Sequence, residues 1–355
     1  MDQFLYDIPV LGLIFQLGGY LIERLPTSAP TIMQAATPLG FGALCGVICE
    51  RSGVVNIGIE GTMLTAAFTG WVTGIAVTGM LGPQTPGPLG ITPVLLIALF
   101  AALLSAVLIS LLHAWMSISV RADQIISGTI INIAAFGVTG YLNNVISQHS
   151  PTSAGQFAQF RVPAEVTQLP VVGWLIAMVL NQGPITMTLL ISAIVLQVFL
   201  FRSRWGLRTR AVGEHPKAAE TVGIDVIRLR YKNVLLAGVF AGLGGAFLSM
   251  ELGNSFQQGG TAGRGFIALA AMIVGRWTPL GALGAALLFS VFLSIGQTIS
   301  FAPPPGQLGE IVAALPPQMF SALPYIVTII VLAGLIGRST PPAADGQPYQ
   351  REATT

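Results

Sequence analysis

Residues 91–116 read ITPVLLIALFAALLSAVLISLLHAWM, and this stretch contains no Asp, Glu, Lys or Arg. A helix needs about 20 apolar residues to cross the roughly 30 Å hydrocarbon core of a bilayer. The apolar residues here follow one another, whereas in the strands of a transmembrane barrel they alternate with polar ones. Because every backbone polar group in lipid must be paired within the protein, this run predicts a membrane-spanning helix.

The composition of the whole chain agrees with this interpretation. Of its 355 residues, 53% are hydrophobic and only 8% are charged, and the mean hydropathy is +0.76. Soluble domains contain about 25% charged residues. The net charge of +2 does not indicate nucleic-acid binding, because membrane topology explains the basic residues. The predicted fold is therefore an all-α, polytopic bundle of transmembrane helices.

Apolar runs broken by Gly, Pro and charged residues predict about nine or ten membrane crossings. The predicted segments are Ile8–Ile22, Thr31–Cys49, Val54–Met80, Ile91–Met116, Gln124–Ile146, Pro184–Phe201, Asn233–Leu252, Gly265–Val274, Pro279–Ile299 and Met319–Ile336. At about 1.5 Å per residue, Gly265–Val274 is too short to cross the bilayer. It is predicted to be a broken or re-entrant helix, which often marks a substrate path, or else a kinked packing helix.

The basic residues predict the orientation of the chain. Residues 202–232 contain eight of the sixteen Lys and Arg residues, so the positive-inside rule places this loop in the cytoplasm. Thirteen of the sixteen then fall on the cytoplasmic side, together with both termini. The expected organisation is a single transmembrane domain over residues 1–337, which includes this loop, and a flexible, polar cytoplasmic tail over residues 338–355.

Within the loop, residues 214–224 read EHPKAAETVGI. Pro216 suits the first turn of a helix, and Gly223 can end that helix in the left-handed conformation. The result is a helix of about seven residues, with Ala218 and Ala219 presenting a small-residue face to a soluble partner. The alternative is a solvated loop whose charge only sets the topology.

Three stretches together resemble a known family of membrane proteins. Arg210–Ile224 resembles the coupling helix of ATP-driven (ABC-type) importer permeases, the element that meets the ATPase subunit. Residues 50–63, ERSGVVNIGIEGTM, and residues 263–281, GRGFIALAAMIVGRWTPLG, resemble permeases of the nucleoside and simple-sugar class. The similarity extends from about residue 31 to residue 337, and the first of these two motifs resembles the shorter of the two paired permeases.

The resemblance implies a permease subunit in a bacterial inner membrane that translocates a nucleoside or a simple sugar. It implies three protein partners: an ABC ATPase subunit, a second homologous permease and an extracytoplasmic substrate-binding lipoprotein. ATP and Mg²⁺ would be bound by the ATPase, and no cofactor is expected in this chain. The residues expected to couple to the ATPase are Glu214, His215, Pro216, Lys217, Ala218, Ala219 and Gly223.

Polar residues within the apolar segments are candidates for the translocation pathway, because such residues are costly in lipid. Asn56 and Glu60 are four residues apart and are predicted to share one helix face, and Glu251 lies near the end of another segment. The uncharged candidates are Asn132, Asn254 and Gln297. Amides suit a neutral, hydrogen-bonding solute. The alternatives are a local capping role for Glu60 and hydrogen bonds between helices for the amides.

Other functions are less consistent with the sequence. A secondary transporter driven by an ion gradient would use Glu60 or Glu251 as a proton carrier, and an ABC permease for branched-chain amino acids is another alternative. A scaffold that recruits a cytoplasmic complex would need no pathway at all.

No enzyme is predicted, because no catalytic constellation or P-loop pattern occurs, and the two lysines, Lys217 and Lys232, do not follow a glycine-rich turn. The three histidines are scattered, at His113, His149 and His215. No metal site is predicted, and Cys45 and Cys49 are interpreted as small packing residues.

Overall fold

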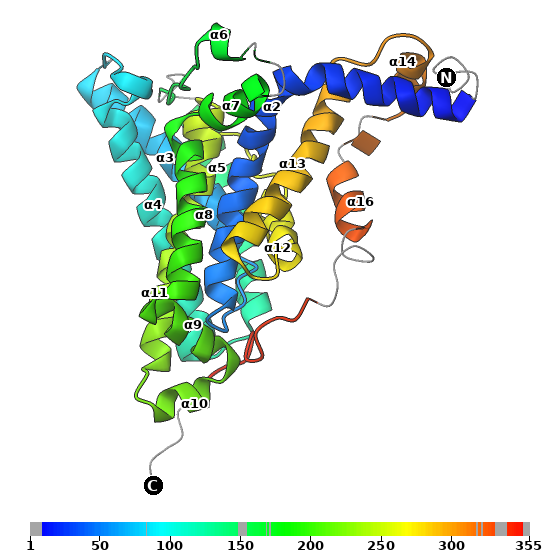
Figure 1. The fold of residues 1–355 in the computed structure, drawn as a ribbon. Coiled ribbons are helices and arrows are strands. Elements are labelled where there is room, and N and C mark those ends of the chain that lie inside the picture. The colour runs from blue at the N-terminus through cyan, green and yellow to red at the C-terminus, as the bar shows by residue number, and fades with distance from the viewer. Residues whose placement is uncertain are drawn as a thin grey trace. The chain divides into compact units, whose positions relative to one another are not determined.

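The computed structural model describes residues 9–82, 84–147, 155–167, 169, 172–316, 319–320, 322–330 and 339–350. The regular secondary structure of these residues is helical and includes no strand, which confirms the all-α fold (Figure 1). The helices are α2 Pro9–Glu50, α3 Ile59–Leu81, η1 Pro88–Gly90, α4 Pro93–Ala114, η2 Trp115–Val120, α5 Gln124–Ser147, α6 Ala164–Thr167, α7 Val172–Leu180, α8 Pro184–Arg202, α9 Arg204–Glu214, α10 Pro216–Thr221, α11 Val226–Phe247, η3 Leu248–Leu252, α12 Arg264–Val274, α13 Pro279–Phe301, α14 Gln307–Ala314 and α16 Leu323–Ile330.

Within the described residues, seven helices are long and apolar enough to cross a membrane. They are Ser28–Glu50, Ile59–Leu81, Pro93–Val120, Gln124–Ile146, Pro184–Arg202, Val226–Leu252 and Pro279–Phe301. The short segment is confirmed as α12, which has 11 residues. This pattern is that of a multi-pass membrane protein.

Two predicted segments differ from the structure. The predicted break between Ile8–Ile22 and Thr31–Cys49 is absent, because α2 continues from Pro9 to Glu50. Of the predicted segment Met319–Ile336, the structure shows α16, and residues 331–338 lie outside the described residues. His149, Arg338 and Arg351 also lie outside them.

The chain forms two compact units. The first contains residues 1–36, 160–182 and 287–335, and the second contains residues 37–159, 183–286 and 336–355. In the first unit, the hydroxyl of Tyr20 donates to the carbonyl of Ala302 and Thr31 Oγ1 lies 3.2 Å from Ser294 Oγ. The second unit contains every motif on which the resemblance rests.

The core of the second unit is α3, α4 and α11, which lie against one another, with α5 beside α3. Glycines allow the close approach of α11 to its neighbours. A Cβ atom at Gly245 would lie 2.1 Å from the carbonyl oxygen of Met63 in α3, and one at Gly238 would lie 2.4 Å from Ser110 Oγ in α4. Close backbone contact at small residues is typical of helix packing in membranes.

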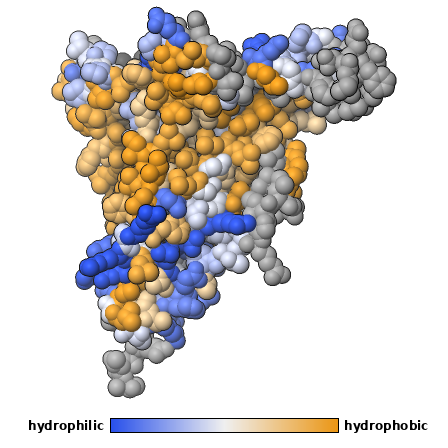
Figure 2. Space-filling model, in the orientation of Figure 1, coloured by the Kyte–Doolittle hydropathy of each residue, from blue (hydrophilic) through white to orange (hydrophobic). Residues whose placement is uncertain are grey.

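The surface of the second unit agrees with a location in lipid. Large hydrophobic side chains are exposed along α4, such as Phe100 and Leu108, and along α8, such as Ile191 and Phe199. Figure 2 shows hydrophobic residues covering this region and hydrophilic residues near α9. Exposed apolar faces of this extent are expected where lipid replaces water as the solvent.

The Gly245 contact predicts a large effect of a side chain at that position. Gly245→Leu should lower the free energy of unfolding by about 1–3 kcal/mol or more, because α11 would have to move away from α3. Gly79→Leu is the matched control, since Gly79 in α3 has nothing within 4 Å of its Cβ position. Thermal unfolding of the detergent-solubilised variants measures this difference, and equal midpoints for the two variants would contradict the contact.

Candidate functional site

Helix α10 confirms the short helix that was predicted in the loop. It contains six residues, Pro216–Thr221, with Pro216 at its first position and His215 at its N-cap. Gly223 has a φ of +82°, the predicted left-handed conformation, and its N–H donates to the carbonyl of Glu220 at 2.8 Å. The chain turns sharply here because glycine has no Cβ to oppose a positive φ.

The two alanines of α10 face different surroundings. Ala219 is buried and packs with Val212, Val226 and Tyr349. Ala218 is exposed, so only one alanine can meet a partner. This division could not be predicted, because α10 is too short to show a hydrophobic period.

Val222 also lies on the free surface and was not predicted to have a role. Its side chain is 75% exposed, four residues after Ala218 and next to Gly223. Lys217, Ala218, Val222 and Gly223 are called the α10 tip below.

Helix α9 was not predicted and forms the base of α10. Its N-cap Ser203 accepts a hydrogen bond from the N–H of Gly206 at 3.1 Å. A Cβ atom at Gly213 would lie 2.3 Å from the carbonyl oxygen of Arg51, so α9 rests directly on the turn that follows α2. The Trp205 indole donates to Asn233 Oδ1 at 3.0 Å and joins α9 to α11.

Residues 339–350 make specific contacts with this region. The N–H of Ala344 donates to the carbonyl of Gly213 at 2.9 Å, and the N–H of Ala343 donates to Glu214 Oε2 at 3.1 Å. The Tyr349 hydroxyl donates to the carboxylate of Glu220 in α10. This segment is called the C-terminal strap, and it holds α9 and α10 at several points.

Charged residues of α2, α11 and the strap lie close together here. Arg230 of α11 donates to the carbonyl of Gln347 at 3.0 Å, and Asp345 faces both Arg230 and Glu50. Burial raises the pKa of Asp345 to about 6, despite the opposing effects of a hydrogen bond to Glu50 and the Arg230 charge. Glu50 itself accepts a hydrogen bond from the Trp277 indole at 2.6 Å.

Glu60 holds the start of α12. Its carboxylate accepts the N–H of Gly263 at 2.8 Å and the N–H of Gly265 at 2.6 Å, at the N-terminus of α12. The first N–H groups of a helix have no partner within it, and their positive dipole end favours a carboxylate. Glu60 is therefore a cap, although on a helix distant in the sequence rather than on neighbouring backbone.

The predicted pairing of Asn56 with Glu60 on one helix face is wrong. Helix α3 begins at Ile59, so Asn56 lies in the turn before it. Asn56 Nδ2 points instead at the sulfur atoms of Cys45 and Cys49, at 3.9 and 3.7 Å. Glycines 53 and 58 interrupt the helical pattern here, and the prediction gave them too little weight.

Glu251 has the same kind of role as Glu60. Its carboxylate accepts the N–H groups of Ile185 and Thr186, at 2.6 and 3.1 Å, at the start of α8. The Thr186 hydroxyl adds a third hydrogen bond at 2.5 Å. Both carboxylates thus bind helix N-termini, and a proton carrier in either position would have to give up these bonds.

The amide candidates fall into separate environments. Asn132 of α5 binds the start of α3, where it accepts the N–H of Gly61 at 2.8 Å and donates to the carbonyl of Ile57 at 3.0 Å. These bonds match the alternative given above for the amides, which was hydrogen bonding between helices. Asn254 is exposed between two residues that line a pocket, and Gln297 is exposed on α13 in the first unit.

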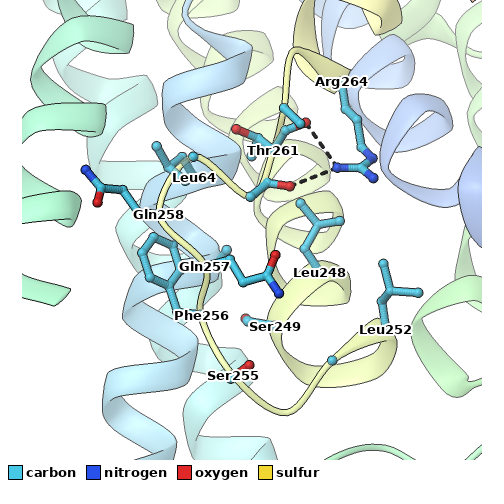
Figure 3. Close-up of a pocket in the computed structure, with 15 residues that line it drawn as sticks. Leu64, Leu248, Ser249, Leu252, Ser255, Phe256, Gln257, Gln258, Thr261 and Arg264 are labelled. Atoms are coloured by element: carbon cyan, nitrogen blue, oxygen red, sulfur yellow. Dashed lines mark hydrogen bonds between the residues drawn. The ribbon is translucent and has the colours of Figure 1, made fainter. Parts of the chain in front are cut away.

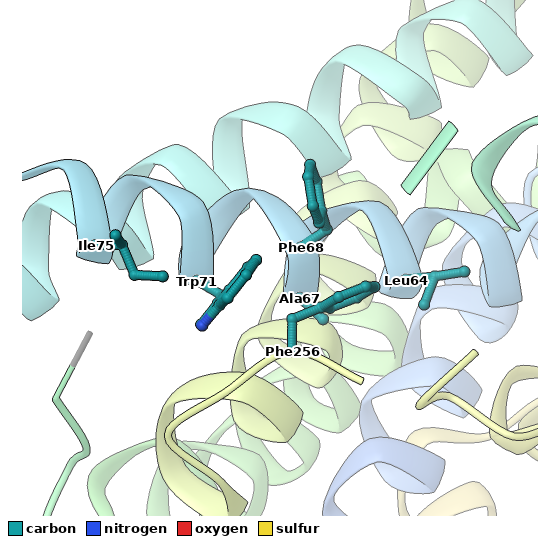
Figure 4. Packing of buried hydrophobic residues seen from close by; sticks show 6 residues of the cluster. All are labelled: Leu64, Ala67, Phe68, Trp71, Ile75 and Phe256. Atoms are coloured by element: carbon teal, nitrogen blue, oxygen red, sulfur yellow. The ribbon is translucent and has the colours of Figure 1, made fainter. Parts of the chain in front are cut away.

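This pocket lies between α3, η3 and the non-helical residues 253–263, and its volume is about 390 Å³ (Figure 3). Ser249, Gln257 and Thr261 supply polar groups, and Leu64 and Phe256 supply apolar surface. Phe256 is held against α3, with its ring centroid 5.2 Å from that of Phe68 in an edge-to-face contact (Figure 4). Of the predicted pathway candidates, Asn254 lies in this segment, and the sequence did not indicate the residues that line the pocket.

Comparison with known proteins gives consistent results. Residues 29–332 match the model of the family described as branched-chain amino acid transport system / permease component. The chain is 38% identical to the guanosine ABC transporter permease protein NupQ of Bacillus subtilis over 93% of this chain and 98% of the relative. It is 39% identical to the nucleoside ABC transporter permease protein NupC of Lactococcus lactis, over 93% and 98%. A putative glucose ABC transporter permease protein, TsgC13 of Haloferax volcanii, is 34% identical over 90% and 96%. No solved structure matches the chain.

The position of Asp345 predicts that attachment of the strap depends on pH. The folded state raises the pKa of this carboxyl group from 3.8 to about 6, so its contribution to stability is complete below the lower value and is lost as the pH rises through the higher one. Hydrogen exchange at the Ala344 amide, corrected for its intrinsic pH dependence, should therefore be slower at about pH 5 than at about pH 7.5. Asp345→Asn should reduce this difference, and a difference of unchanged size in that variant would contradict the assignment.

The capping bonds predict the effect of removing the charge of Glu60. Glu60→Gln should lower the free energy of unfolding by about 1–3 kcal/mol, because the amide has only one oxygen to accept the two N–H groups. Glu23→Gln, at an exposed position on α2, is the control. Chemical denaturation of the two variants in detergent measures the effect, and equal stability would show that the cap contributes nothing.

Proposed function

Because this chain belongs to the branched-chain amino acid transport system / permease component family and is a membrane-spanning permease subunit of an ABC transporter, we propose that it imports a nucleoside. The two relatives that are 38–39% identical over nearly their whole length carry names with guanosine and nucleoside. A simple sugar is the second candidate, because a relative that is 34% identical is named for glucose. The names of these relatives do not favour an amino acid.

The exposed α10 tip is the observation that supports coupling of this chain to the ATPase subunit. Permeases of ABC transporters work with an ATPase subunit and a substrate-binding protein. A short helix with small Ala218 and apolar Val222 on its free surface suits a groove on the ATPase. The side chains of His215, at the N-cap, and Lys217, within the helix, are also exposed. Glu214 and Glu220 accept hydrogen bonds from the strap.

The strap and α9 give the α10 tip a rigid support. α9 contacts the turn after α2 through Gly213, and Arg51 in that turn donates to the carbonyls of Trp277 at 2.8 Å and Arg276 at 3.2 Å. These two residues lie in the turn after α12, which ends at Val274. Force applied at the α10 tip would thus reach α12 through contacts within one compact unit.

The proposed assembly has a defined orientation and composition. α10 and both termini face the cytoplasm of a bacterium, as the basic residues indicate, and the chain lies in the inner membrane. A second homologous permease pairs with this chain, and a substrate-binding lipoprotein delivers the solute on the opposite side. The ATPase subunits bind ATP and Mg²⁺.

Reconstitution tests the function directly. The chain, its partner permease, the ATPase subunits and the binding protein are placed in lipid vesicles, and uptake of labelled guanosine, cytidine and glucose is measured with and without ATP. ATP-dependent uptake of a nucleoside is expected. Accumulation of glucose alone would favour the sugar reading, and uptake that persists without ATP but collapses with a proton uncoupler would overturn the function.

Two substitutions at the α10 tip test the docking surface. Ala218→Arg and Val222→Asp should each abolish co-purification of the ATPase, because a buried charge without a partner costs several kcal/mol. The fold of this chain should be unaffected, since both side chains are exposed. Ala218→Ser keeps a small side chain and should bind the ATPase like the unmodified protein. Normal assembly with both charged variants would place the contact elsewhere.

A further inference from the structure

Residues 253–263 form a non-helical segment that lies alongside α3. At one end Phe256 packs against Trp71, with ring centroids 6.1 Å apart. At the other end Gly263 binds Glu60. Trp71 and Glu60 are separated by about 16 Å along α3, or about half the thickness of the hydrocarbon core.

Irregular backbone at this depth has a physical requirement. Its N–H and C=O groups cannot face lipid, so it occurs only where protein buries it or where it lines a polar cavity. Part of this segment is satisfied internally, since Gly260 and Ala262 donate to the carbonyls of Gln257 and Gly259, both at 2.9 Å. The remainder faces the pocket of about 390 Å³.

The opposite wall of the pocket is the π-helical turn η3, which contributes Leu248, Ser249 and Leu252. This turn ends the long helix α11 and leads directly into the non-helical segment. Ser249 is only 1% exposed, and its hydroxyl has no hydrogen-bond partner among the described residues. An unpaired buried hydroxyl is unfavourable, and a ligand that bonds to it would remove this cost.

We propose that this pocket binds the transported solute, and that the solute is a neutral ring compound bearing several hydroxyl or amide groups. The inference rests on the proposed function for the fact of transport, and it assigns the site within this chain. Ser249 would bind a polar group of the solute, Gln257 and Thr261 would bind others, and Leu64 with Phe256 would contact the ring.

The chemistry of the lining supports a neutral solute. The described residues that line the pocket include no carboxylate, lysine or histidine. Their one cation is Arg264, whose Nη1 donates to the carbonyls of Gly260 at 2.8 Å and Thr261 at 3.3 Å (Figure 3). The arginine therefore stabilises the loop. The volume lies within the range that accommodates small molecules in protein sites.

The test compares two buried hydroxyls in the assembled transporter. Ser249→Ala should raise the KM for guanosine uptake about five- to tenfold, because one hydrogen bond to the solute is lost. Ser110→Ala is the matched control, since Ser110 is equally buried and also has no partner among the described residues, but lies between α4 and α11. Its KM should equal that of the unmodified protein, and the amount of bound ATPase should be the same in both variants.

A second variant gives a readout that does not depend on transport. The thiol of Ser249→Cys should react with a small hydrophilic thiol reagent in the assembled transporter, and guanosine should slow that reaction. The unmodified protein supplies the background, because Cys45 and Cys49 are free but do not line the pocket, whereas Ser249 does.

These experiments distinguish a wrong assignment of the solute site from a wrong assignment of the transport function. If the unmodified transporter takes up guanosine while Ser249→Ala retains its KM and guanosine does not protect Ser249→Cys, the pocket is not the solute site. If the unmodified transporter takes up none of the solutes tested, the proposed function fails, and the site falls with it.

Discussion

The structure of the second unit depends on the pairing of backbone N–H groups at helix starts that lie among apolar residues. Two carboxylates supply this pairing, Glu60 for α12 and Glu251 for α8. Water cannot satisfy these groups in a bilayer, so each carboxylate fixes a helix start that would otherwise be unfavourable. Glu60 and Glu251, the two carboxylates that could suggest proton transport, thus serve to stabilise helix starts.

The sequence predicted those features that depend on local pattern. Long apolar runs located the membrane helices, and the positions of Pro216 and Gly223 located α10, because proline and glycine act on the backbone where they occur. The residues responsible for the resemblance lie at α3, α10 and α12, and family membership is confirmed over residues 29–332.

Features that depend on distant contacts were missed or misread. Nothing near Glu60 indicates that its partners lie at Gly263 and Gly265, and Asn56 was placed on a helix that begins only at Ile59. The division of Ala218 from Ala219 depends on Tyr349, which packs from the end of the chain. Residues 338–355 were predicted to be a flexible tail because their composition is polar and shows no period, and the contacts that residues 339–350 make with α9 and α10 are with residues distant in the sequence.

The turn after α12 has a consequence for how the subunit deforms. Arg276 and Trp277 both have positive φ, at 54° and 51°, which is unfavourable for residues with a Cβ and persists only where neighbouring contacts enforce it. Arg51 and Glu50 supply those contacts. Such a joint resists bending, so α12 and the turn before α3 would be displaced as one rigid piece. A pull on the cytoplasmic side would then change the shape of the proposed solute pocket without first unwinding any helix.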